Sequence, residues 1–402
     1  MNTKYSFLGK KNSLKIGLAL SFFTFSMLLN CLSIVILNYF GQKKFVLLGS
    51  LEVFKDLPIA FLAAFISRYI PRIGHINSII TGLSIAFILC IITPFVDDFW
   101  FFKIWFLLIG LCFILVKISV LYITINLSKA EENGSRFMQF IEASFMAGIV
   151  IVNLIFGLIM GSSSPYLWKY GFWAIAFFSL ITIGFLYSGK TVWQKAYTNT
   201  ADQKSTIVSS SWQVMKKSFL FLAIVFFIII TEQSFTTWLP TYSKAIFNAD
   251  PFTATQTTVI FAFSALAGRI IYGMLILKRS WNKLFAGLLV SIFIIVSCVS
   301  GILIFEKPHQ IFLYLIPCMG FFIGPLYPII NAHQLYSLPN EQERGTLLGL
   351  IIVFSSLASC TSSLVIGLTL DHIQPEYAFT LLFLPTIALS ALFLNYKRQP
   401  IS

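Results

Sequence analysis

The sequence contains twelve apolar stretches, each long enough to cross the hydrocarbon core of a membrane. A helix rises about 1.5 Å per residue, so roughly 20 apolar residues span that core. Backbone amides have no water partners in lipid, and the two-residue alternation of membrane β-barrels is missing, so these stretches must be helices. The sequence therefore predicts an all-α polytopic membrane protein. Its twelve transmembrane spans are 15–38, 45–66, 77–96, 100–126, 137–160, 168–188, 218–242, 254–277, 284–305, 310–332, 346–370 and 377–396.

Composition excludes an ordinary soluble domain. Of the 402 residues, 57% are hydrophobic and only 11% are charged, whereas soluble chains carry about a quarter of their residues as charges. The first apolar run is too long for a signal peptide and no convincing cleavage site follows it, so we expect a retained first helix. All six cysteines fall inside predicted spans without metal-ligand spacing, which indicates packing and predicts neither a metal nor a cofactor.

The basic residues of the connections gather on one side of the predicted bundle. An even number of spans places both termini on the same face, and most of the 28 lysines and arginines fall on that face. Because positive residues accumulate on the cytoplasmic side, we expect both termini in the cytoplasm and the protein in the inner membrane. The net charge of +13 then reflects orientation in the bilayer and does not indicate a nucleic-acid partner.

A long polar connection, with a Ser209-Ser210-Ser211 run, divides the chain into two similar halves. We predict an N-terminal six-helix bundle over 1–189, a flexible linker over 190–217 and a C-terminal six-helix bundle over 218–402. The fifth and eleventh spans both follow short segments that contain glycine and arginine, and short basic connections follow the second and eighth spans. Two pseudo-symmetric halves are typical of transporters with a binding site near the membrane midplane.

Seven ionisable residues fall inside the predicted spans. A charge at bilayer depth costs about 2.5–3.5 kcal/mol on insertion scales, so these residues are the first candidates for a site. Glu52 and Asp56 lie four residues apart on one helical face, and Lys55 can pair with Glu52. Two interpretations stay open: a self-neutralising cluster near the outer mouth, or an Asp56 that is left without a partner and carries a proton.

Three further charges lie toward the cytoplasmic half of the spans. Lys117 and Glu142 are at similar depth, so they form either a structural ion pair or a pair that an anionic substrate opens while Glu142 accepts a proton. The fork of Arg269 suits a carboxylate or phosphate, and alternatively it closes a gate by bonding carbonyl groups of the other half.

Polar residues on the seventh and tenth spans also indicate a cavity wall. Glu232 is followed by Gln233 and several hydroxyl residues, an uncommonly polar run for a spanning helix. Glycine and proline residues between 320 and 328 are expected to break or bend the tenth span, which also carries Tyr327 and Asn331, and so free carbonyl groups for a ligand. The remaining hydrogen-bonding candidates, on the first and fourth spans, are Asn30, Tyr122 and Asn126.

These segments resemble the major facilitator superfamily, and in particular its fucose–proton symporter branch, which includes TsgA-like permeases. The resemblance covers essentially the whole chain and is carried by the segments Gly134–Gly148 and Phe235–Lys244. It implies two six-helix bundles in the fold of that superfamily, and a gating loop to which Arg68 and Arg72 correspond.

The departures from the family pattern concern charged positions. Ala63 and Ser67 stand where the loop has its usual glycine and aspartate, so the relay role of that aspartate does not carry over. The neighbourhoods of the two fucose-branch acids, on the first and fourth spans, have no acid here, and Lys117 occupies the second. Fucose itself is therefore not the expected substrate.

The expected function is secondary active transport by alternating access. No GxxxxGK[ST] motif for ATP occurs, so a proton gradient is the default energy source. The expected substrate is a small sugar-like solute or an organic anion such as a carboxylate, a siderophore or an amino acid. We expect a monomer whose partners are the bilayer, the solute and protons. The alternatives are an enzyme, which scattered histidines without a catalytic motif argue against, and a transport-incompetent membrane sensor or scaffold.

Overall fold

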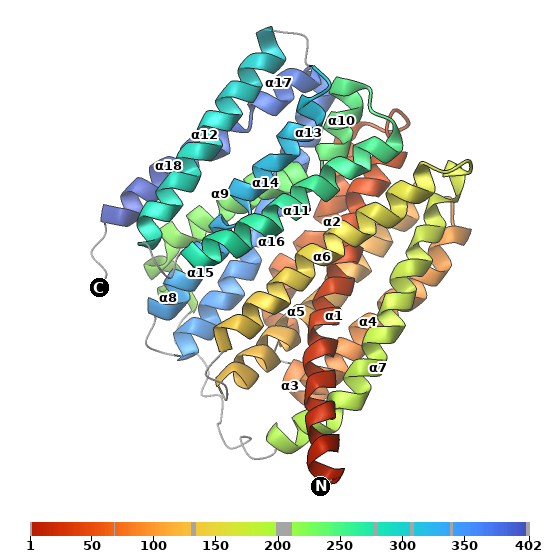
Figure 1. Cartoon of the computed structure of the whole chain (residues 1–402), viewed down its shortest axis with the longest axis vertical. Coiled ribbons are helices and arrows are strands. Elements are labelled where there is room, and N and C mark those ends of the chain that lie inside the picture. The colour runs from red at the N-terminus through yellow and green to blue at the C-terminus, as the bar shows by residue number, and fades with distance from the viewer. Residues whose placement is uncertain are drawn as a thin grey trace.

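The structure, a computed structural model, is built from helices and short connections (Figure 1). It describes residues 2–67, 69–129, 134–197, 211–275, 280–305, 309–337 and 341–398. The first group of helices is α1 (Asn2–Asn38), α2 (Phe45–Ser67), α3 (Ile70–Ile73), α4 (His75–Ile92), η1 (Thr93–Phe95), α5 (Phe99–Lys129), α6 (Gly134–Met160), η2 (Pro165–Tyr170) and α7 (Gly171–Tyr197).

The second group of helices follows in the other part of the chain, and its predicted spans are more often divided into short helices. Its elements are α8 (Ser211–Lys217), α9 (Phe219–Thr236), α10 (Leu239–Phe247), α11 (Pro251–Leu275), α12 (Trp281–Phe305), α13 (Phe312–Leu315), η3 (Ile316–Met319), α14 (Gly320–Ile323), α15 (Leu326–Ser337), α16 (Glu341–His372), α17 (Pro375–Thr380) and α18 (Phe383–Arg398).

Each of the twelve predicted spans coincides with one helix or with a run of consecutive short helices, which confirms the predicted fold class. Eleven segments among the described residues are long and apolar enough to cross a membrane. The twelfth span, α2, is not among them because it has three charged residues, Glu52, Lys55 and Asp56, in its middle. It nevertheless forms an unbroken helix of 23 residues, since its charges are buried against other helices.

The predicted break of the tenth span is confirmed. The chain there forms four short helical segments, α13 to α15 with η3 between them. Pro317 and Pro325 cannot donate a backbone hydrogen bond, so the i to i−4 ladder is interrupted at each. In the same way, Pro385 explains the break between α17 and α18 near Leu381, because the carbonyl of Leu381 lacks its usual donor.

The structure describes the two ends of the predicted linker 190–217. Helix α7 continues to Tyr197, and α8 occupies residues 211–217, while 198–210 lie outside the described residues. A helix with long polar side chains such as Lys190 and Gln194 can extend beyond the bilayer, because these side chains reach water. Both ends of the predicted linker are therefore helical.

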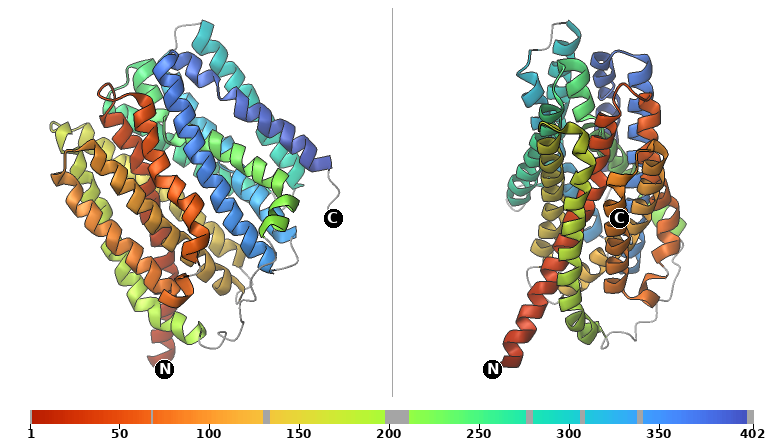
Figure 2. Two further views of the ribbon diagram at one scale, coloured as in Figure 1. Left: turned by 180° about the vertical axis from the view of Figure 1, so that it is seen from behind. Right: turned by 90° about the vertical axis from the view of Figure 1, so that its right-hand side faces the viewer.

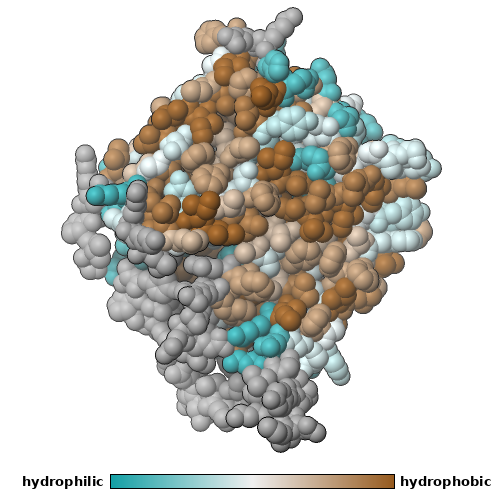
Figure 3. All heavy atoms as spheres, in the orientation of Figure 1, coloured by the Kyte–Doolittle hydropathy of each residue, from teal (hydrophilic) through white to brown (hydrophobic). Residues whose placement is uncertain are grey.

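The two groups of helices lie side by side, with α1–α7 on one side and α8–α18 on the other (Figures 1 and 2). We call them the N-half and the C-half. Apolar side chains cover much of the middle of the visible face (Figure 3), and Phe61 and Phe95 are each 70% exposed. Such a surface is suited to contact with lipid and not with water.

Two helix pairs form the seam between the halves: α2 with α16, and α6 with α11. Because the chain crosses twelve times, both termini lie at one end of the bundle, and we call the opposite end the far end. Among the described residues, hydrogen bonds join residues 45–52 of α2 to residues 233–371 of the C-half, in the far-end part of the seam. The structure is therefore closed at the far end.

Glycine allows the backbones to approach closely at this end of the seam. A Cβ atom added to Gly367 would lie only 2.7 Å from the carbonyl oxygen of Phe45, and one added to Gly49 would lie 2.6 Å from that of Ser363. Real Cβ atoms are never so close to a backbone oxygen. The closed seam thus requires glycine at both positions.

Candidate functional site

A cavity of about 170 Å³ lies between the two halves, near the middle of the spans. Helices α1, α2, α5 and α6 of the N-half and α9, α11, α15 and α16 of the C-half contribute to its wall. Of the predicted residues, the N-half places Asn30, Lys55, Asp56, Lys117 and Glu142 on the wall. The C-half adds Glu232, Gln233, Arg269 and Tyr327.

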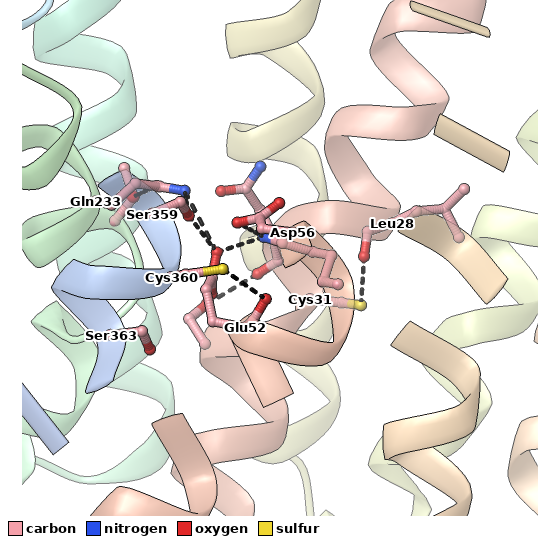
Figure 4. A network of polar contacts seen from close by, with 12 residues as sticks. Leu28, Cys31, Glu52, Asp56, Gln233, Ser359, Cys360 and Ser363 are labelled. Atoms are coloured by element: carbon pink, nitrogen blue, oxygen red, sulfur yellow. Dashed lines mark hydrogen bonds and ion pairs between the residues drawn. The ribbon is translucent and has the colours of Figure 1, made fainter. Parts of the chain in front are cut away.

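Helix α2 holds the densest group of charges (Figure 4). The Nζ atom of Lys55 lies 2.5 Å from Oε1 of Glu52 and 3.8 Å from Oδ2 of Asp56. All three side chains are buried, and that of Glu52 is completely inaccessible. The structure thus contains the expected Glu52–Lys55 pair, and Asp56 is the more distant of the two acids from the Lys55 ammonium.

Glu52 does not line the cavity, although the sequence made it a candidate. Its carboxylate points into the seam, where the hydroxyl of Ser359 donates to Oε1 at 2.7 Å. The amide of Gln233 approaches the same oxygen at 3.5 Å and donates to the Ser359 hydroxyl at 2.9 Å. Glu52 therefore joins the N-half to the C-half just above the cavity.

Lys117 and Glu142 both line the cavity, but the expected ion pair between them is not formed. In the part of the chain that the structure describes, no carboxylate lies within 4 Å of the Lys117 ammonium, which is 5.2 Å from the ring centre of Phe113. The charges of Glu142 and Asp56 both act on it at longer range. Lys117 therefore interacts with both acids at a distance and forms a direct ion pair with neither.

Arg269 is held inside its own half. One guanidinium nitrogen donates to Oε1 of Glu232 at 3.1 Å, and Nε donates to the carbonyl of Gly324 at 3.0 Å. This carbonyl lies at the break between α14 and α15, so the broken tenth span supplies an acceptor for Arg269. The expected bond to carbonyl groups of the other half is not present, because Glu232 on α9 competes for the guanidinium.

Small polar side chains complete the wall. Thr236 and Thr237 continue the polar run on α9, as the sequence indicated, and Ser355, Ser356 and Ser359 come from α16. These serines escaped the sequence reasoning. Their signal is a stripe at helical spacing, which the sequence continues at Ser362 and Ser363.

Four predicted residues lie elsewhere or are not described. Tyr122 stacks on His75 inside the N-half, with ring centres 4.1 Å apart, because α4 and α5 face each other there. Asn331 of α15 lies off the cavity, and its buried Oδ1 has no hydrogen-bond partner in the described structure. The side chain of Asn126 and the whole of Arg68 lie outside the described part of the chain.

Arg72, the other residue of the predicted gating loop, is exposed on α3 at the end of the bundle that carries the termini. Its guanidinium lies 5.6 Å from the ring centre of Tyr69. Within the described residues, no group of three or more histidine, cysteine or acidic side chains could hold a metal ion. The site that the structure offers is therefore a polar cavity between two rigid halves.

Comparison with models of known protein families shows the family to which the chain belongs. The model of the Major Facilitator Superfamily matches residues 14–363, which is most of the sequence. The chain belongs to this superfamily. It is a multi-pass membrane transporter and not an enzyme. No curated protein matches the chain.

Solved structures share the fold at low sequence identity. A D-xylose–proton symporter is 14% identical with a TM-score of 0.74, and the match covers 94% of this chain and 96% of the symporter. The nucleoside transporter NupG is 12% identical with a TM-score of 0.71, covering 96% of this chain and 100% of NupG. These similarities support the fold. They do not specifically confirm the predicted fucose–proton symporter or TsgA-like branch.

Proposed function

We propose that the protein is a secondary active transporter that moves a small, hydroxyl-rich polar solute together with protons by alternating access. The observation that carries the proposal is the cavity between the halves, which has the acids Asp56 and Glu142 on one wall and a row of hydroxyl and amide groups on the other. Two of the structures that share the fold, named above, transport D-xylose with protons and nucleosides. Both are small hydroxylated solutes.

The distribution of charge favours a neutral solute. Glu52 neutralises Lys55, and Glu232 neutralises Arg269. Asp56 and Glu142 then face a single unpaired cation, Lys117, so the cavity has no surplus of positive charge for an anion. Neutral hydroxyl groups can bond the serines and threonines of the C-half, while a proton on an acid of the N-half balances its charge.

An organic anion is the second candidate substrate, and one observation favours it. The Lys117 ammonium lines the cavity and has no ion-pair partner among the described residues, so a carboxylate of the solute can bind it. On this alternative, the Lys117→Gln variant loses transport of anions.

Proteoliposomes with an imposed pH gradient test the proposal. Uptake of labelled pentoses, hexoses, nucleosides and small carboxylates is measured with the gradient present and after a protonophore collapses it. We expect gradient-driven uptake of a neutral hydroxylated solute by both the parent and Lys117→Gln proteins. Uptake of carboxylates alone, abolished in Lys117→Gln, selects the anion. No uptake of any solute by folded protein contradicts the transport proposal.

The orientation is also part of the proposal. We place both termini in the cytoplasm of the inner membrane, because most basic connections lie at that end, and we propose a monomer. The structure is then shut toward the outside. Impermeant thiol reagents applied to intact cells should label a cysteine at exposed Tyr166, at the far end, and spare one at exposed Trp212, near the termini. The reverse pattern contradicts the orientation.

A further inference from the structure

We propose that closure of the far-end seam is linked to protonation of Asp56, because Glu52 is held across the seam and keeps the ammonium of Lys55 for itself. The linkage rests on the proposed proton-coupled transport, and it names the residues that couple the proton to the movement of the halves.

The first step of the argument is the charge imbalance on α2. Two buried carboxylates, Glu52 and Asp56, share one ammonium, that of Lys55. Neither Glu52 Oε2 nor Asp56 Oδ2, both buried, has a hydrogen-bond partner in the described structure. Two carboxylates this close to each other in a medium of low dielectric constant do not both stay ionised with a single counter-ion, so one of them takes up a proton.

The second step decides which acid takes the proton. Lys55 lies 2.5 Å from Glu52 and 3.8 Å from Asp56, so the direct ion pair belongs to Glu52. The hydroxyl of Ser359 adds a charge-assisted hydrogen bond to Glu52 at 2.7 Å, and Gln233 lies at 3.5 Å (Figure 4). Glu52 thus has the direct ion pair and both hydrogen-bonding partners from the C-half. The proton therefore resides on Asp56.

The third step is that this arrangement exists only while the seam is closed. Ser359 and Gln233 belong to the C-half, whereas Lys55 is fixed to the N-half. A Cβ atom added to Gly110 of α5 would collide with the carbonyl oxygen of Lys55, so the backbone of α2 packs directly on α5 at that point. When the halves part, Glu52 loses its C-half partners and meets water, while Lys55 keeps its place between the two acids.

The groups around Asp56 leave this assignment unchanged. On its own helix it faces Glu52 and Lys55. From the cavity side, the ammonium of Lys117 on α5 interacts electrostatically with Asp56. The same ammonium also interacts with Glu142 on α6. Helices α16 and α1 contribute the buried thiols Cys360 and Cys31. Two neighbours of Asp56 belong to the C-half: the Cys360 thiol and the Ser359 hydroxyl, which also acts on the Asp56 carboxylate. The charged neighbours Glu52, Lys55 and Lys117 are all in the N-half and move with Asp56 when the seam opens.

The consequence is a proton taken up on closure. With the seam open, Lys55 pairs with Asp56, which is then ionised; with the seam closed, Lys55 pairs with Glu52 and Asp56 is protonated. The closed form thus binds one more proton than the open form. By linkage, lowering the pH by one unit raises the ratio of closed to open protein up to tenfold.

The test measures the seam directly and needs no substrate. Spin labels are placed on Tyr166→Cys and Phe305→Cys, which are 76% and 86% exposed at the far end of different halves. The exposed Cys298 and Cys318 are first replaced by alanine. In the full chain in lipid nanodiscs, we expect the closed population to increase as the pH falls.

The Asp56→Asn variant mimics the protonated acid. It should be closed at every pH, and its pH dependence should vanish. An unchanged pH dependence in this variant overturns the proposal. The result also separates the two proposals: proton-coupled uptake with an unchanged seam response leaves the transport function standing, whereas a normal seam response without uptake of any solute leaves the linkage standing.

A second pair of variants guards against misfolding. Ser359→Ala removes the hydrogen bond that Ser359 donates to Glu52 across the seam. The midpoint pH of closing should therefore fall, while the closed population should still depend on pH. Ser362→Ala is the matched control, because this hydroxyl on the same helix bonds Ser234 and the carbonyl of Ile230 within the C-half. Equal shifts of the closing midpoint in both variants contradict the role given to Ser359.

Discussion

The carboxylate of Asp371, near the end of α16, binds the start of α2 in the opposite half. Its Oδ1 accepts from the backbone N–H of Phe45, and its Oδ2 accepts from that of Val46, each at 2.8 Å. The first amides of a helix have no acceptor within the helix, and the positive end of the helix dipole favours an anion there. Asp371 therefore caps α2 across the seam, and it does so only in the closed form.

The structure gives the size of the effect. Removing a capping side chain costs about 1 kcal/mol, and losing a favourable charge at a helix N-terminus costs about 0.3–1 kcal/mol more. Since the open form never has these bonds, Asp371→Ala destabilises the closed form alone by about 1–2 kcal/mol. That corresponds to a roughly 5- to 30-fold lower ratio of closed to open protein.

The assay is the distance between labels on Tyr166→Cys and Phe305→Cys at fixed pH. Asp250→Ala serves as control, because Asp250 caps α11 from the adjoining loop of the same half, accepting from the amides of Phe252 and Thr253 at 3.0 and 3.1 Å. We expect the control to melt at a lower temperature with the same closed fraction. An Asp371→Ala ratio within about twofold of the parent refutes the reasoning, as does an equal shift in the control.

Two further predictions concern packing and pH. Gly367→Ala should favour the open form in the same distance measurement, because its Cβ meets the carbonyl of Phe45 at 2.7 Å, whereas Gly349→Ala on the same helix meets nothing within 4 Å and should not. At the far end, the hydrogen bond and charge of Lys169 lower the pKa of exposed Asp97 below its usual 3.8. Its stabilisation is therefore present above about pH 4 and lost as the pH falls, so Asp97→Asn should slightly lower the melting temperature at pH 7 but not below about pH 3.

The fold was largely predictable because the membrane constrains it so strongly. Runs of apolar residues define the spans. Even α2 was predicted, because the run remains long and apolar on both sides of its three charged residues. Helix ends were less predictable. Helix α7 continues to Tyr197 through polar sequence, because nothing in hydropathy marks the point where a helix leaves the bilayer and continues into water.

The site was predictable as a set of residues but not as a set of contacts. Charges inside spans are rare, so the candidates stood out, and the Glu52–Lys55 pair followed from spacing within one helix. Partners on different helices depend on rotation and depth, which the sequence does not encode locally. The pairing of Arg269 with Glu232, and the contact of Glu52 with the C-half, became visible only in three dimensions.

The pair of Arg269 and Glu232 allows a structural role to be separated from substrate binding. Both side chains are nearly buried, at 13% and 10% exposure, so removing one partner leaves an uncompensated charge and typically costs about 3–5 kcal/mol. We therefore expect Arg269→Gln and Glu232→Gln each to lower the melting temperature strongly. The double variant removes both charges of this pair, so neither is left uncompensated, and it should recover much of the loss.

Transport by the recovered double variant then decides the role of Arg269. If the guanidinium only neutralises Glu232 and holds the carbonyl of Gly324, uptake of a neutral solute should return together with stability. If Arg269 anchors an anionic solute, the double variant should fold and still fail to transport, because the fork that binds the anion is gone. A folded but inactive double variant thus contradicts the neutral-solute proposal.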